Sequence, residues 1–391
     1  MRKIIFIILL FYISIANGQN AYQSVIDQVE ANSPILSSLK MQADAEKAEN
    51  HAGSLFANPE FEAGYHWGLN GNEQRRIALE ISQEFDFPSV YSNKKKLRKM
   101  NAEVIDAEYD IQRNELLFEV QLLCNDLIYN KIKIEENNHC LKCAEMTLES
   151  YKNKFDTGEA TIIDYKKAQL AYIGNKNEHD LLILERDALI GRLKVLNGGQ
   201  NIDFEQDTYA NLTLPADFEE WYKNVEANNP VFVRLEMENA VNQRNVKLKK
   251  SEWFPSLKIG YLVEDESEGG YHGPQIGLSL PLWGNARTVR SARLRAESGE
   301  TMLENQRVML KNELYNTYLR AKSLEENHET MNAMMSEADN EELLQKLLDK
   351  GEMTLFDYLI ETEYQHQISL KVIDIQYELQ KALLELHRYS M

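Results

Sequence analysis

The feature that most constrains this sequence is a set of prolines that recurs at nearly one spacing. Pro34 and Pro230 lie 196 residues apart, as do Pro59 and Pro255, and Pro88 and Pro281 lie 193 residues apart. Neighbouring residues agree as well, since Ala-Asn-Ser-Pro ends at Pro34 and Ala-Asn-Asn-Pro ends at Pro230. The pattern predicts two copies of one unit, over 19–200 and 216–391, joined by a linker over 201–215. Such repeats are typical of units that cannot bury their apolar surface alone.

The first 18 residues predict a secretory signal peptide. Arg2 and Lys3 precede an apolar run from Ile4 to Ile13, and small residues lead up to Gly18. The run is shorter than the roughly 20 apolar residues that a spanning helix needs, so we expect cleavage rather than anchoring.

Composition narrows the class of protein further. The 62 acidic residues outnumber the 43 basic ones, and the net charge of −19 makes nucleic acid an unfavourable partner because it repels phosphate. Only 8 prolines and 18 glycines favour long helices over a loop-rich fold. Three cysteines are too few, and odd in number, for a disulfide framework.

Each copy is expected to begin with a helix of about 35 residues, from Ala21 to Phe56 and from Asp217 to Trp253, because Pro59 or Pro255 follows and cannot continue a helix. Two stretches of period-two alternation come next in each copy, which predicts a β-hairpin. In the first hairpin, Asn70-Gly71-Asn72 begins the turn, and in the second the loop contains Gly269-Gly270.

One face of these four strands is apolar and the other is polar. We expect the apolar face to contact lipid through Phe61, Tyr65, Trp67, Ile77, Leu79, Ile81, Leu257, Ile259, Tyr261, Ile276, Leu278 and Leu280. The opposite face would meet water through Glu62, Glu80, Glu84 and Asp86. Alternation of this kind over about ten residues is typical of outer-membrane strands.

A long helix is predicted from Ser89 to Thr157. Apolar residues recur there every seven positions, at Val120, Leu127, Ile134, Leu141, Leu148 and Phe155. Gly158 and Gly351 fall where such helices would stop, since glycine accepts the left-handed C-terminal conformation cheaply. A shorter helix then returns, to about Leu196 in the first copy and to the chain end in the second.

The strand count predicts an oligomer. Four strands cannot close a barrel, and open sheet edges in hydrocarbon leave backbone groups unpaired at a cost of several kcal/mol each. Three chains would supply twelve strands.

This order of elements resembles the TolC family of outer-membrane efflux proteins, with the heavy-metal efflux branch as one candidate. The resemblance rests on Asn58-Pro59-Glu60-Phe61, on Pro88 and Pro281, and on the segments Phe155–Tyr165 and Leu348–Tyr358. It implies a mixed α and β fold: a trimeric twelve-stranded barrel in the outer membrane, continued by an α-helical coiled-coil tunnel in the periplasm. It also implies a passive exit duct of a tripartite pump, with no cofactor, whose partners are a periplasmic membrane-fusion adaptor, an inner-membrane pump and outer-membrane lipid.

By the same resemblance, the two glycine turns would be periplasmic tips that dock the adaptor. The tip residues are Asp156, Gly158, Glu159, Asp349, Gly351 and Glu352. The nearest candidates for carboxylates at the tunnel entrance are Asp164, Asp357, Glu361 and Glu363. Asp164 and Asp357 could equally be helix caps without a role in the lumen.

Other interpretations remain open. No P-loop, nucleophile elbow or HExxH motif is present, so we expect no enzyme. The segment His139-Cys140-Leu141-Lys142-Cys143, with Glu136 one turn earlier, could bind a metal. Because structural zinc sites need four ligands held by a turn, ordinary helix positions with reduced thiols are favoured and we expect no metal site. The basic run Lys94–Lys99 could bind lipid head groups or simply be solvated. The cargo could be a metal ion or a small molecule; the alternatives are a type I protein secretion duct and a periplasmic coiled-coil adaptor or scaffold.

Overall fold

The computed structural model describes residues 22–52, 56–67, 75–266, 269–338 and 341–388. The predicted signal peptide and the Asn70-Gly71-Asn72 turn lie outside the described residues. The chain divides into two compact units. One, here called the helical unit, comprises Arg113–Val225, Leu310–Met391 and the chain up to Ser37; the other, the sheet unit, comprises Ser38–Gln112 and Glu226–Met309. Each compact unit therefore takes segments from both halves of the chain.

The predicted first helix of each half is broken in two. Helices α2 (Gln23–Asn32) and α3 (Pro34–Ala52) occupy the first half, and α6 (Phe218–Asn228) and α7 (Pro230–Ser251) the second. The breaks fall at Ser33 and Asn229, whose ψ angles of 118° and 119° are extended rather than helical. The prediction of one continuous helix was wrong because a proline disfavours the helical conformation of the residue before it.

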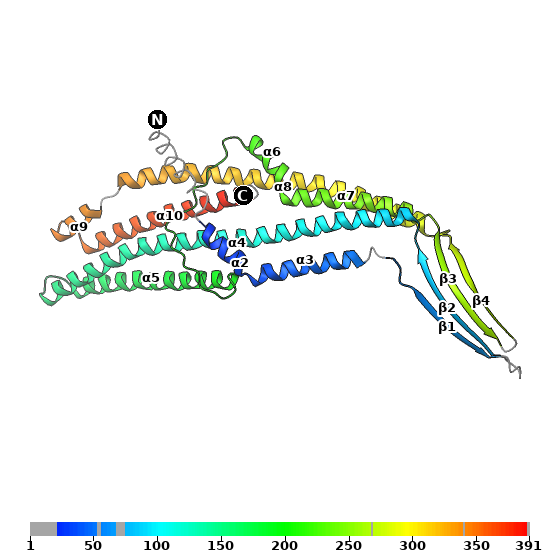
Figure 1. Cartoon of the computed structure of the whole chain (residues 1–391). Coiled ribbons are helices and arrows are strands. Elements are labelled where there is room, and N and C mark those ends of the chain that lie inside the picture. Colours follow the sequence, from blue (N-terminus) through cyan, green and yellow to red (C-terminus); the bar gives the residue numbers. More distant parts are fainter. Residues whose placement is uncertain (1–21, 53–55, 68–74, 267–268, 339–340, 389–391) are drawn as a thin grey trace, which may run out of the picture. The chain divides into compact units, whose positions relative to one another are not determined.

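The long helix predicted after Pro88 is present as α4 (Pro88–Asp156), 69 residues in length (Figure 1). Helix α5 (Ile162–Leu196) follows it; the second half contains α8 (Asn285–Ala338), α9 (Glu341–Asp349) and α10 (Leu355–His387). The seven-residue apolar repeat predicted from Val120 to Phe155, here called the seam, is buried at Val120, Leu127 and Ile134. It is only half-buried at Leu141 and Leu148, and Phe155 is exposed. No helix in the described ranges is both long and apolar enough to cross a membrane.

Two apolar clusters form the core of the helical unit. One joins α6, α8 and α10 around Phe218, Ala321 and Leu383. The other joins α4, α5, α9 and α10 around Tyr151, Ala168 and Tyr358. The second cluster lies beside the turns that follow α4 and α9. It therefore holds the helices that flank these two turns against one another.

The sheet unit contains a four-stranded antiparallel sheet in the order β1-β2-β3-β4. Its strands are β1 (Glu60–Trp67), β2 (Arg75–Phe85), β3 (Ser256–Glu266) and β4 (Gly269–Ser279), drawn as arrows in Figure 1. The two hairpins are joined by β2 and β3, which pair from Arg76 with Glu266 to Phe85 with Leu257. Gly269 and Gly270 belong to β4 rather than to the predicted loop, because both pair with β3. Leu280 lies just after β4.

Candidate functional site

The turn after α4 ends the helix with two characteristic backbone hydrogen bonds. The amide of Glu159 donates to the carbonyl of Lys154 at 2.7 Å, and the amide of Gly158 donates to the carbonyl of Phe155 at 3.1 Å. This pattern is the Schellman motif, which requires a left-handed residue at its centre. Gly158 supplies it with a φ of 79°.

The turn after α9 repeats this geometry. The amide of Glu352 donates to Leu347 at 2.9 Å, the amide of Gly351 donates to Leu348 at 3.1 Å, and Gly351 has a φ of 73°. A Cβ added at either glycine would meet no atom within 4 Å. Conformation alone therefore selects glycine at both turns, and the side chains around them, including Asp156, Glu159, Asp349 and Glu352, are exposed.

Two of the four predicted entrance carboxylates lie in the first turns of the helices that follow these turns, where each is bonded to the N-cap threonine. Thr161 accepts a hydrogen bond from the amide of Asp164 at 3.2 Å and donates its hydroxyl to the Asp164 carboxylate at 2.6 Å. Thr354 and Asp357 make the same two contacts at 3.2 and 2.6 Å. These contacts stabilise the first turns of α5 and α10. Glu361 and Glu363 follow on the exposed surface of α10.

The pairing of the strands places the predicted lipid-facing residues on one side of the sheet. Phe61 lies opposite Ile81, which in turn lies opposite Tyr261. The apolar side chains of this face are exposed by 39% at Leu79 and by 77% at Ile276. No other described part of the chain covers this face enough to bury it.

The opposite face of the sheet is charged. Glu62 lies opposite Glu80, and Lys258 is 3.3 Å from the Glu80 carboxylate. Arg76 pairs with Glu264 across β2 and β3. One sheet thus separates an apolar face from a face of cross-strand ion pairs, although each such surface pair contributes little to stability.

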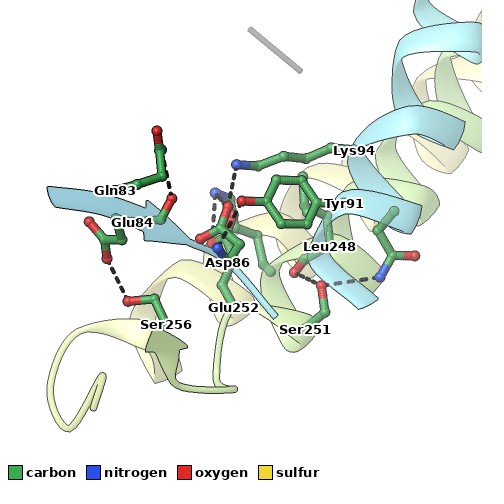
Figure 2. Close-up of polar contacts among 11 residues, drawn as sticks. Gln83, Glu84, Asp86, Tyr91, Lys94, Leu248, Ser251, Glu252 and Ser256 are labelled. Carbon is green, nitrogen blue, oxygen red and sulfur yellow. Dashed lines mark hydrogen bonds and ion pairs between the residues drawn. The ribbon is translucent and has the colours of Figure 1, made fainter. Parts of the chain in front are cut away.

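The transition from β2 to α4 is fixed by polar contacts (Figure 2). The Lys94 ammonium binds the Asp86 carboxylate at 2.7 Å, and the Tyr91 hydroxyl accepts from the Asp86 amide at 2.9 Å. Asp86, which was predicted to face water in a lumen, lies just beyond β2 and forms an ion pair with Lys94 of α4. Ser256 of β3 donates to Glu84 of β2, so the two hairpins are also bonded where they leave the helices.

A further polar cluster lies inside the helical unit. Glu136 and Cys140 on α4 meet His366 on α10, with Cys140 Sγ 3.1 Å and Glu136 Oε1 3.3 Å from His366 Nδ1. These two contacts, the first with Cys140 and the second with Glu136, raise the pKa of His366 to about 10. The contact with His366 in turn lowers the pKa of Glu136. The cluster thus gathers a thiol, a carboxylate and an imidazole from two helices around one ring nitrogen.

Sequence reasoning singled out Cys140 and Glu136 but missed His366. The spacing of Glu136 and Cys140 places them on one helix face, which local patterns can show. His366 lies 226 residues from Cys140 along the chain, and only the packing of α10 against α4 brings them together.

Several solved structures share this fold. CusC, whose crystal structures describe transmembrane channel formation, matches with a TM-score of 0.77 and 14% identity over 95% of this chain and 92% of CusC. The outer-membrane channel CmeC of Campylobacter jejuni matches with a TM-score of 0.74 and 14% identity over 94% of this chain and 85% of CmeC. The open state of the MtrE outer-membrane channel of Neisseria gonorrhoeae matches with a TM-score of 0.75 and 14% identity over 94% of this chain and 88% of MtrE.

No family model and no curated protein sequence matches the chain. The similarity to outer-membrane channels is thus one of fold, and it covers nearly the whole of this chain and most of each channel. The resemblance predicted from the proline spacing, the alternating strands and the glycine turns is confirmed at the level of the fold.

Proposed function

We propose that this chain is the outer-membrane exit duct of a tripartite efflux pump, a passive channel that exports metal ions or small molecules. The observation that carries the proposal is the sheet, with one exposed apolar face and one charged face, in a fold shared with outer-membrane channels. A strand with this alternation is stable where one face meets lipid and the other meets water. The helices then form the periplasmic extension.

The same sheet supports a homotrimer. Among the described residues, β1 pairs only with β2 and β4 pairs only with β3, so each of the two outer strands has one free edge. A free edge within lipid leaves backbone donors and acceptors without partners. Three chains, each contributing four strands, close a twelve-stranded barrel in which every strand is paired.

The glycine turns of the helical unit support docking of a periplasmic adaptor. Both turns expose carboxylates, and one apolar cluster packs the helices that flank them into a single surface. A rigid exposed surface costs little conformational entropy on binding, which favours recognition by a partner. The adaptor would connect this surface to an inner-membrane pump.

Two roles are compatible with the four entrance carboxylates. Asp164 and Asp357 accept hydrogen bonds from the N-cap threonines of their helices, and Asp164 is half-buried while Asp357 is exposed. Glu361 and Glu363 are exposed and free to face a lumen in a trimer. Three copies of each would form rings of negative charge, which attract cations and exclude anions.

Differential extraction of membranes tests the proposal against the alternative of a periplasmic scaffold. The duct is expected in the outer-membrane fraction, to resist carbonate and to need detergent for release, because the apolar face of the sheet lies in lipid. A scaffold of packed helices would be released by carbonate. Release of the full-length protein by carbonate alone would contradict the proposed function.

A further inference from the structure

The cluster between α4 and α10 contains three side chains of the types that bind transition metals. Glu136 and Cys140 are one helical turn apart on α4, and His366 comes from α10. One ligand atom from each lies within 4.8 Å of the other two. We propose that Glu136, Cys140 and His366 bind one Zn²⁺ ion, which ties α4 to α10 inside the helical unit.

The distances fit such an ion. Cys140 Sγ is 3.1 Å from His366 Nδ1, and Glu136 Oε1 is 3.3 Å from the same nitrogen. In a tetrahedral zinc site, with a Zn–S distance of about 2.3 Å and Zn–N and Zn–O distances of about 2.0 Å, neighbouring ligand atoms lie about 3.3–3.6 Å apart. The His366 nitrogen therefore lies within a few tenths of an ångström of the tetrahedral spacing from both the sulfur and the oxygen, and all three atoms lie within 4.8 Å of one another.

Nε2 of His366, the ring nitrogen that would not bind the ion, is placed to donate the second hydrogen bond that a metal-bound histidine usually makes. The His366 side chain is only 6% exposed, and its Nε2 has no hydrogen-bond partner among the described residues. A carboxylate oxygen of Glu178 on α5 lies 4.0 Å from Nε2. Metal-bound histidines usually donate their other N–H to a carboxylate, which fixes the ring and its tautomer. A small movement of Glu178 completes this contact and leaves Nδ1 free to bind the ion.

The three ligand side chains border a cavity. The three side chains line a cavity of roughly 1070 Å³, together with Met331 and Met335 of α8. A water molecule in this cavity would complete a tetrahedral site that has three protein ligands.

The ligand types select the metal. Thiolate and imidazole ligands exclude Mg²⁺ and Ca²⁺, which prefer oxygen, whereas a set of sulfur, nitrogen and carboxylate oxygen suits Zn²⁺. The ion is a resident part of the helical unit and not cargo, so the inference does not rest on the proposed function. It joins residues 226 positions apart in the chain.

Zinc titration of the purified full-length protein, reduced and stripped of metal, tests the proposal. Competition with a chromophoric chelator is expected to show one Zn²⁺ per chain, and Co²⁺ in its place should give a thiolate-to-metal charge-transfer band. Cys140→Ser and His366→Asn are each expected to weaken Zn²⁺ binding by at least about 100-fold, since both remove a ligand atom. Glu178→Gln is expected to weaken it by about tenfold, because it alters only the partner of Nε2.

Cys143→Ser is the matched control. Cys143 lies three residues from Cys140 on the same helix and lines the same cavity, but it is outside the group of three. It should keep wild-type affinity and the Co²⁺ band. Circular dichroism of each variant shows whether its helices are intact, and Glu136→Gln, a half-buried substitution of the same size, provides a third ligand variant.

Two results would overturn the assignment. One is the absence of saturable Zn²⁺ binding by the wild-type protein. The other is a loss of binding in Cys143→Ser as large as that in Cys140→Ser. Neither result would change the membrane fraction in which the protein is found, so a failure here is distinguishable from a failure of the proposed duct.

Discussion

The helical unit and the four-stranded sheet differ in what stabilises them. The helical unit buries two apolar clusters, and Leu383 and Ala321 in one of them are 2% and 0% exposed, although Leu170 and Leu184 of α5 are exposed. The sheet leaves its apolar face uncovered, with Phe61 and Ile276 exposed by 70% and 77%. The chain therefore supplies a buried core for part of its helices, while no described residue covers the apolar face of its sheet. In the proposed duct, lipid and strands from other copies would cover that face.

Truncation of a core leucine should have the largest effect. Leu383→Ala is expected to lower the free energy of unfolding of the helical unit by about 2–5 kcal/mol, because it leaves a cavity in a closed core. The matched change on the sheet, Leu278→Ala, removes an exposed side chain and should alter the helical transition by no more than about 0.5 kcal/mol. Chemical denaturation followed by far-ultraviolet circular dichroism compares them. Equal effects would mean that the sheet and the helices share one core.

A charge on the apolar face of the sheet should have the next largest effect. Leu79→Arg is expected to cost about 2–4 kcal/mol if Leu79 lies near the bilayer centre, and thus to deplete the protein from the outer membrane. Ala78 is the neighbouring residue of β2, but it lies on the charged face beside Glu264. Ala78→Arg should therefore insert normally. Insertion of both variants to the same extent would remove the distinction between the two faces.

The glycine turns allow a smaller and more local test. Gly158→Val is expected to cost about 1–2 kcal/mol, because a β-branched residue tolerates the left-handed conformation poorly. Assembly should survive, while resistance of cells that depend on the duct should fall as the docking surface changes. Gly191→Val in α5, which also has no atom within 4 Å of an added Cβ and lacks a positive φ, is the control. Wild-type export by the Gly158 and Gly351 variants alike would exclude docking at these turns.

The entrance carboxylates should give the smallest energetic effect. Joint substitution of Asp357→Asn, Glu361→Gln and Glu363→Gln is expected to reduce cation selectivity in planar bilayers, at roughly 1 kcal/mol or less per ion because the groups are exposed. The reversal potential in a salt gradient measures it.

Neutralising three exposed carboxylates elsewhere provides the control for this triple variant. Glu304, Glu313 and Glu329 lie on α8 and are exposed. Their joint substitution by glutamine changes the net charge equally and should leave selectivity unchanged. Equal loss of selectivity in both triple variants would assign the effect to overall charge rather than to an entrance.

Local features of the fold could be predicted from the sequence. Gly158 and Gly351 were identified because one residue type alone fits the conformation at the end of a helix. The two faces of the sheet followed from alternation, which the pairing of Phe61 with Ile81 confirms. The breaks at Ser33 and Asn229 are also local, because each residue precedes a proline, which disfavours the helical conformation there.

Contacts between distant segments could not be predicted in the same way. His366 meets Cys140 only because α10 packs against α4, and no spacing along the chain encodes that contact. The burial of the predicted seam also depends on packing: Val120 is fully buried, whereas Phe155 stacks on Tyr165 at the exposed turn. Periodicity identifies one face of a helix but not how much of that face is covered.

The mass of the detergent-solubilised protein tests the central claim most directly, because the claim is that one chain cannot complete its own sheet. The strand count predicts a particle containing three chains, stable while the sheet is intact. Native mass measurement gives the number of chains per particle, and circular dichroism on the same sample gives its β-sheet content. Three copies per particle is the predicted result, and a stable monomer with its full β-sheet signal would contradict the account.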